Sequence, residues 1–143
     1  MKAYLSRRYH FSASHRLYSK CYTIEENRSV FGKCNNPHGH GHNYVVEVTM
    51  SGQVNPDTGM VFNLAELDAF AQAHVLTPFD HQNLNTLTVF QDVVPTTENL
   101  AIAMHQIFDA FPAARLENVH VEETSNNSFD YAGDSGDYID RRL

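Results

Sequence analysis

The spacing of apolar residues changes twice along this chain of 143 residues, from a period of two to a helical period and back to two. Strict alternation is typical of a strand with one buried face, and it predicts strands within residues 4–17, 42–52, 118–124 and 129–132. The helical spacing predicts one helix from Asn63 to the residue before Pro78 and a second from Thr96 or Thr97 to Pro112. This order indicates an α+β domain, with an antiparallel sheet and both helices on one face of it.

The chain shows neither an internal repeat nor a linker, so residues 1–133 are predicted to form a single domain. Residues 134–143 contain few apolar side chains, and we expect a mobile C-terminal tail. Residues 18–41 lack periodicity and are rich in Asn, Gly, Pro and Lys. A long loop is predicted there, and long loops in compact domains are usually functional.

The charge balance bears on the partners of the protein. Seventeen acidic residues against ten Lys and Arg give a net charge of -7, whereas nucleic-acid binders usually carry a basic patch. DNA, RNA and anionic membrane surfaces are therefore unfavourable partners. An apolar run of the ~20 residues that a membrane helix requires is absent, and the N-terminus does not resemble a secretion signal. We expect a cytoplasmic protein in which Cys21 and Cys34 are free thiols.

Histidine is concentrated in one short stretch, which suggests a metal site. His40 and His42 are two residues apart, so in an extended segment both side chains point to one face, ~6.6 Å apart. His15 lies on the apolar face of the first predicted strand and is the natural third ligand of a catalytic zinc site, which leaves one position open. A buried structural His15 beside a polar HGHGH loop is the alternative, and His38 is a rival ligand that spacing does not exclude.

Candidate proton-transfer groups lie in the same loop and after the first helix. Cys34 precedes His40 by six residues, and a nearby dication and imidazoles would lower its pKa enough to make the thiolate a usable base or nucleophile. Cys21 has no such neighbours. Asp80 and His81 could form a histidine oriented by an acid, although adjacent side chains need not face each other, and a loop role is equally compatible.

Candidate ligand-binding groups include an acid on an apolar face. Glu123 has the parity of Val119 and Val121, and a buried carboxylate there requires a partner, such as a ligand that offers paired N–H donors. Glu98 lies in the first turn of a helix, where an acid is already favoured by the helix dipole. The basic side chains near the first strand's end either contact a polyphosphate or form a solvated face; they are Arg16, Lys20, Arg28 and Lys33.

Several motifs in one order carry a resemblance to a known family. They are FSASHRLYSK, FGKCNNPHGHGHNY, NPDTGM, NLAEL, FDHQNL, DVVPTTENLA and VEETSNN. Together they resemble the 6-pyruvoyl-tetrahydropterin synthase family from about Ser6 to Gly133. The resemblance implies a T-fold, in which a four-stranded antiparallel sheet backs two helices. It also implies that three subunits close their sheets into a barrel, which removes exposed sheet edges, and that two such trimers stack into a homohexamer.

The resemblance also implies roles for individual residues. His15, His40 and His42 look like the zinc ligands, Cys34 like the catalytic thiol, and Asp80 and His81 like the proton-transfer pair. Glu123 resembles the carboxylate that anchors the pterin ring, assisted by Thr96, Thr97 and Glu98. His38 creates a second HGH frame, which matches the CxxxHGH spacing of the related 6-carboxy-tetrahydropterin synthases. Aligning on the HNY that begins the strand keeps His40 and His42.

The implied reaction is elimination of triphosphate from 7,8-dihydroneopterin triphosphate, which gives 6-pyruvoyl-tetrahydropterin without an external redox cofactor. The alternative product is 6-carboxy-tetrahydropterin with release of acetaldehyde, on the way to deazapurine nucleosides such as queuosine. A zinc-binding or pterin-binding module without turnover is a third hypothesis, and Cys34, Asp80 and His81 argue against it because binding alone needs no base.

Overall fold

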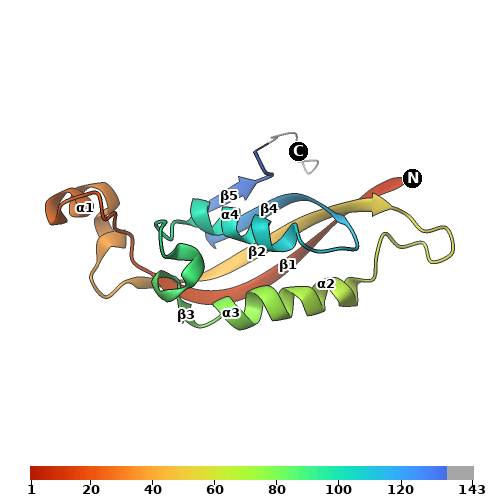
Figure 1. Cartoon of the computed structure of the whole chain (residues 1–143), viewed down its shortest axis with the longest axis horizontal. Helices are drawn as coiled ribbons and strands as arrows, with labels where there is room; N and C mark the ends of the chain where they lie inside the picture. The colour runs from red at the N-terminus through yellow and green to blue at the C-terminus, as the bar shows by residue number, and fades with distance from the viewer. Residues whose placement is uncertain (135–143) are drawn as a thin grey trace.

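The computed structural model describes residues 1–134 and contains a five-stranded sheet in the order β3-β1-β2-β4-β5 (Figure 1). The strands are β1 (Lys2–His15), β2 (His40–Gln53), β3 (Gln82–Asn83), β4 (Arg115–Thr124) and β5 (Asn127–Tyr131). Strands β1, β2, β4 and β5 are antiparallel neighbours and confirm the predicted strands. The sheet is nevertheless mixed, because β3 adds a parallel pairing to β1. With two residues, β3 is too short for alternation to reveal it.

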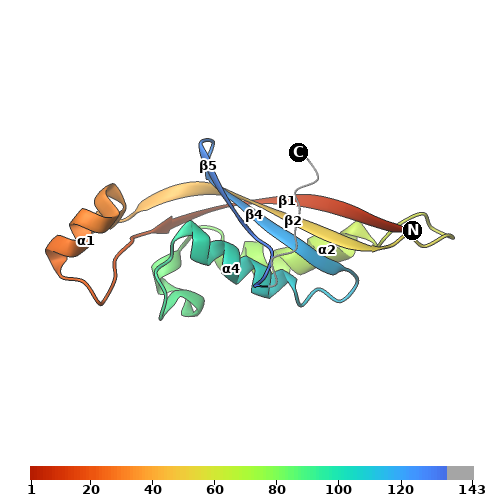
Figure 2. The same cartoon turned by 90° about the horizontal axis from the view of Figure 1, so that it is seen from above.

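The helices α2 (Leu64–Ala71) and α4 (Thr97–Phe108) lie on one face of the sheet, as predicted (Figure 2). Their apolar sides pack against the alternating inward residues of the strands. The fully buried side chains of this core include Tyr44, Val46, Val48, Met50, Leu67, Leu100, Met104, Phe108, Val119 and Val121. Thr96 caps α4 by accepting a hydrogen bond from the Asn99 backbone N–H, which fixes where the helix begins.

The first predicted helix does not stop before Pro78, so that boundary was wrong. A π-helical turn (Gln72–Leu76) follows α2 and leads into α3 (Thr77–Phe79). The Thr77 N–H bonds to the Gln72 carbonyl, five residues back, and Pro78 stands in the first turn of α3. The proline ring fixes φ at about −65°, which is compatible with helical backbone.

Residues 18–41 also differ from the predicted loop, because they contain α1 (Ile24–Phe31) and a 3₁₀ turn, η1 (Gly32–Asn35). Thr23 and Glu26 form a capping box at the start of α1. The helix lacks an apolar stripe, and Asn27 is its single buried residue, so a search for helical periodicity misses it. In Figure 1, α1 lies beyond one end of the sheet, away from α2 and α4.

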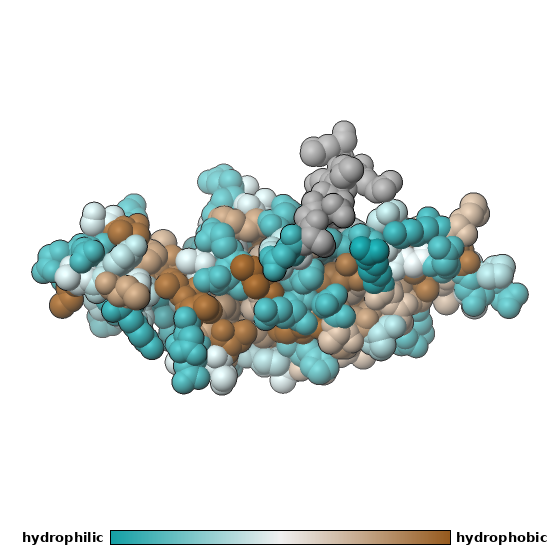
Figure 3. Space-filling model, turned by 45° about the horizontal axis from the view of Figure 1, so that its top comes forward, coloured by the Kyte–Doolittle hydropathy of each residue, from teal (hydrophilic) through white to brown (hydrophobic). Residues whose placement is uncertain are grey.

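The surface is mixed in character. On the face drawn in Figure 3, hydrophobic residues form separate patches among hydrophilic ones. None of the described helices is long and apolar enough to cross a membrane. The tail predicted at residues 134–143 lies, except for Asp134, outside the described residues.

Candidate active site

Three histidines meet at one end of the β1–β2 pair. His15 is the direct cross-strand partner of His40, and His42 stands opposite Ala13 on the same inner face. Their ligand nitrogens all lie within 4.8 Å of one another. The Nε2 atoms of His15 and His40 are 3.1 Å apart. The structure thus brings together the three predicted metal ligands.

His38, the rival ligand, lies outside this cluster. It is exposed, and its backbone N–H donates to the Asn36 side chain. The turn that separates His38 from His40 depends on Gly39, whose φ of +71° is in the left-handed region. A Cβ atom at Gly39 would lie 2.9 Å from the His15 carbonyl oxygen, so only glycine fits this approach.

The chemistry of the cluster fits a zinc ion. His15 Nδ1 is 2.8 Å from the Pro95 carbonyl oxygen, to which it donates, and this leaves Nε2 of the neutral ring as an acceptor or ligand. Burial lowers the pKa of His15 and His42, which favours the neutral imidazoles that metals require. The buried Nε2 of His42 has no hydrogen-bond partner among the described residues. Three imidazoles, one of them with an unsatisfied ring nitrogen, suit an open tetrahedral site.

Glu123 points toward these histidines from β4, on the apolar face predicted for it. Its Oε1 lies 3.2 Å from His42 Nε2 and 3.7 Å from His15 Nε2. Its Oε2 accepts a hydrogen bond of 2.8 Å from the Asn127 side chain. The carboxylate is therefore held at the histidine cluster by protein groups, whereas its role toward a ligand remains a prediction.

Cys34 lies in η1 and shares a pocket with His40. The pocket is also lined by Gly32, Lys33 and Asn36. The Cys34 carbonyl accepts from the Leu17 N–H at 2.8 Å, which holds η1 against the chain just after β1. Burial raises the pKa of the Cys34 thiol, and the charge of Glu123 adds to the rise. The predicted lowering depends on a bound dication beside the thiol, and it stays a prediction. Cys34 and Cys21 are both free, as predicted.

Asp80 and His81 face each other directly after α3. His81 Nδ1 lies 3.0 Å from Asp80 Oδ1, and the Ser12 N–H donates to the same oxygen at 2.9 Å. The contact is possible because His81 has a φ of 59°, and its N–H bonds to the Ser12 carbonyl. The Ser12 N–H, helped by His81, lowers the pKa of Asp80. His81 lines a groove with Ser12, Ser14 and residues 41–43, but neither Cys34 nor Glu123 lines it.

Thr97 and Glu98 occupy different environments at the start of α4. Thr97 is buried, and its hydroxyl has no hydrogen-bond partner among the described residues. Glu98 is exposed in the first turn. Tyr44 and the Pro95 carbonyl were not predicted as parts of the site. Tyr44 could have been predicted, because it has the same parity as His40 and His42. The Pro95 carbonyl could not, because every residue has a backbone carbonyl.

Comparison with known proteins decides the family. The family model described as 6-pyruvoyl tetrahydropterin synthase matches residues 4–134. The chain belongs to that family. The 6-pyruvoyl tetrahydrobiopterin synthase of Homo sapiens is 50% identical over 135 residues, which cover 93% of each chain. The structure of the Caenorhabditis elegans 6-pyruvoyl tetrahydropterin synthase superposes with a TM-score of 0.88 at 41% identity, over 93% of this chain and 96% of that one.

A relative named as a 6-carboxy-tetrahydropterin synthase matches a smaller part of this chain. The putative 6-carboxy-5,6,7,8-tetrahydropterin synthase of Archaeoglobus fulgidus is 40% identical over 63 residues, or 44% of this chain and 50% of its own length.

Proposed function

We propose that this chain is a zinc-dependent lyase that eliminates triphosphate from 7,8-dihydroneopterin triphosphate and forms 6-pyruvoyl-tetrahydropterin. The observation that carries the proposal is the cluster of His15, His40 and His42, with Cys34 in the pocket that His40 lines. The 6-pyruvoyl relatives support this product, because the human sequence matches 93% of the chain, whereas the 6-carboxy relative matches 44%.

His15, His40 and His42 would hold the ion, and Glu123 would accept N–H groups of the pterin ring. When bound, zinc would supply Lewis-acid polarisation of the substrate's side-chain hydroxyls. The reaction requires a base to remove carbon-bound protons and a group to return them, while triphosphate departs with the electron pair of its C–O bond. Cys34 is the protein candidate for that base, since it shares a pocket with the ligand His40.

Asp80 and His81 form an oriented acid–imidazole pair, which suits relay of a proton. The groove that His81 lines does not include Cys34, so we propose that Asp80 and His81 serve the site of a neighbouring subunit. An oligomer is also supported by β1, which pairs with β3 only at Ala13 and Ser14 among the described residues. The remaining edge of β1 offers backbone groups to a second chain, as in the implied trimer barrel and hexamer.

The 6-carboxy product is the second candidate. His38 supports it, because Cys34 and residues 38–40 reproduce the CxxxHGH spacing. The placement of His38 outside the cluster favours the 6-pyruvoyl frame instead.

Product analysis tests the proposal. The zinc-loaded protein is incubated with 7,8-dihydroneopterin triphosphate, the pterin product is identified by mass, and acetaldehyde is measured separately. We expect 6-pyruvoyl-tetrahydropterin and triphosphate in equal amounts. Stoichiometric acetaldehyde would instead establish the 6-carboxy reaction, and an unchanged substrate would refute both.

A further inference from the structure

The described cationic side chains divide into two groups by position. Those on β1 and β4 each lie within 4.0 Å of a carboxylate; they are Lys2, Arg7, Arg8 and Arg115. Those on the segment that joins β1 to β2 have no carboxylate within that distance among residues 1–134; they are Arg16, Lys20, Arg28 and Lys33. The unpaired cations therefore gather on one segment, although the chain as a whole carries a net charge of -7.

Lys33 is an unpaired cation next to the proposed catalytic thiol. It directly precedes Cys34 in η1, and it lines the same pocket as Cys34 and His40. An ammonium group at this pocket has three N–H donors and no acidic partner among the described residues. It is therefore available to an anionic ligand.

Arg16 directly follows His15 and is held in place from several sides. Its backbone N–H and carbonyl both bond to the Asn85 side chain, at 2.7 and 2.8 Å. Its Nε donates to the Asn35 carbonyl at 3.1 Å, and its guanidinium lies over the Tyr18 ring, 5.1 Å from the centroid. Among residues 1–134 the two terminal nitrogens have no hydrogen-bond partner, which leaves them for a planar, bidentate contact of the kind that favours phosphate. Arg16 also lines a hollow with His15 and Gly39.

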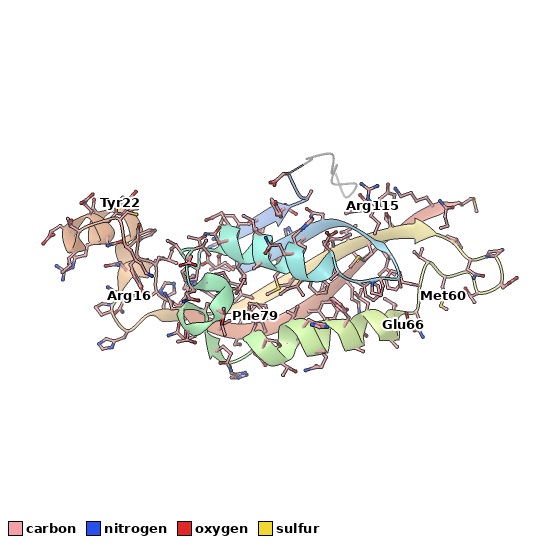
Figure 4. The ribbon with its side chains drawn as sticks, in the orientation of Figure 1. Arg16, Tyr22, Met60, Glu66, Phe79 and Arg115 are labelled. Atoms are coloured by element: carbon pink, nitrogen blue, oxygen red, sulfur yellow. The ribbon has the colours of Figure 1, made fainter. Side chains whose placement is uncertain are left out.

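We propose that Lys33 and Arg16 form the subsite for the phosphate groups of the substrate, with Lys20 and Arg28 adding to the positive field around it. This inference rests on the proposed function, since it names the groups that bind the triphosphate. An acidic protein repels a polyanion over most of its surface. Cations without carboxylate partners make the local potential positive, so a polyanion is attracted there. Figure 4 places Arg16 at the end of the sheet that carries α1, and Arg115 at the opposite end.

Binding measurements on full-length variants test the subsite. Lys33→Gln and Arg16→Gln remove the charges, Arg16→Lys keeps charge without the planar fork, and Arg115→Gln is the matched control at the far end. Calorimetry follows three probes, 7,8-dihydroneopterin triphosphate, 7,8-dihydroneopterin and inorganic tripolyphosphate. Circular dichroism and the melting temperature verify that each variant folds.

We expect Lys33→Gln and Arg16→Gln each to weaken binding of the two triphosphate probes by about tenfold or more, the usual loss for a charged hydrogen bond. Affinity for 7,8-dihydroneopterin should be unchanged, Arg16→Lys should recover part of the loss, and Arg115→Gln should bind like wild type. Equal losses for the phosphorylated and unphosphorylated pterin, or a folded double variant with wild-type affinity, would overturn the subsite.

Failure of the proposed function would look different. The wild-type protein would then bind neither pterin, and the tripolyphosphate data alone would decide the anion subsite. Tripolyphosphate binding that both Gln variants lose would support it, and binding that neither loses would refute it.

Discussion

His15 Nδ1 lies 2.8 Å from the carbonyl oxygen of Pro95, although the two residues are 80 positions apart in the sequence. The segment before α4 thereby orients a histidine at the end of β1. The Asn99 side chain holds that segment by donating to the Val94 carbonyl at 2.8 Å. Because His15 Nδ1 donates to Pro95, its Nε2 is directed toward His40 and His42.

Removing a ligand histidine should abolish zinc retention. His15→Ala and His40→Ala each leave two imidazoles, and we expect zinc affinity to fall by more than the ~10–100-fold known for the loss of an outer-shell partner. His38→Ala is the control and should keep its zinc, because His38 lies outside the cluster. Metal analysis after dialysis measures this. Zinc lost from His38→Ala and kept by His40→Ala would show that the other HGH frame binds the metal.

Cys34→Ala should separate catalysis from binding. We expect zinc content and substrate affinity near wild type, with turnover reduced by about 10²–10⁴-fold, the usual contribution of a positioned acid or base. Cys21→Ala is the matched control, since Cys21 is exposed and does not line the Cys34 pocket. Steady-state rates of triphosphate release measure the effect. A Cys34→Ala protein with wild-type turnover would remove the thiol from the mechanism.

Glu123→Gln should weaken pterin binding and leave zinc in place. The substitution turns an accepting oxygen into a donor that faces a donor of the ring, at a cost of about 1.5–3 kcal/mol. Titration calorimetry with 7,8-dihydroneopterin, together with metal analysis, measures both properties. Glu123 lies 3.2 Å from His42, so it could act on the metal site in place of the pterin. Loss of zinc with unchanged pterin affinity would identify the carboxylate as part of the metal site.

Gly39→Ala should disturb the site through the backbone. Its Cβ would meet the His15 carbonyl at 2.9 Å, in addition to the strain of a positive φ. Gly59→Ala is a matched control, because Gly59 has nearly the same φ, +72°, but no atom within 4 Å of the added Cβ. Strain at such a position costs about 1–3 kcal/mol. Denaturant unfolding should show a larger loss of unfolding free energy for Gly39→Ala than for Gly59→Ala, and Gly39→Ala should also bind zinc more weakly. Equal losses and equal zinc contents in the two variants would contradict the close approach.

A site shared between subunits predicts complementation. Cys34→Ala and His81→Ala proteins, each nearly inactive, should regain activity when they are unfolded and reassembled together. Random pairing of equal amounts restores about one site in four, because each active site needs an intact group from both chains. Reassembled mixtures that form verified mixed oligomers and stay inactive would place all these groups within one chain.

Alternation along the strands was sufficient to predict the inward side chains of the site. His15 and Glu123 face the helix-covered side because their parity matches that of buried neighbours such as Phe11 and Val121. The pairing of His15 with His40 then follows from the antiparallel register of β1 and β2.

Other parts of the site have no signature in the pattern of apolar residues. The contact between Asp80 and His81 depends on a backbone φ of 59°, which side-chain type alone does not specify. His15 bonds to the backbone carbonyl of Pro95, so the residue type at position 95 does not predict this hydrogen bond. Helix α1 was missed because it lacks an apolar stripe, and the Thr23–Glu26 capping box at its start was the available signal.

Zinc titration of the metal-free protein tests the central claim most directly. Zinc is added stepwise to protein stripped by a chelator, and the rate of triphosphate release from 7,8-dihydroneopterin triphosphate is measured together with bound zinc. The rate should rise in proportion to bound zinc and reach a plateau at about one ion per chain, because three imidazoles form one open site. His42→Ala should show no such rise. Full activity of the metal-free protein, or a rate independent of bound zinc, would contradict a zinc-dependent lyase.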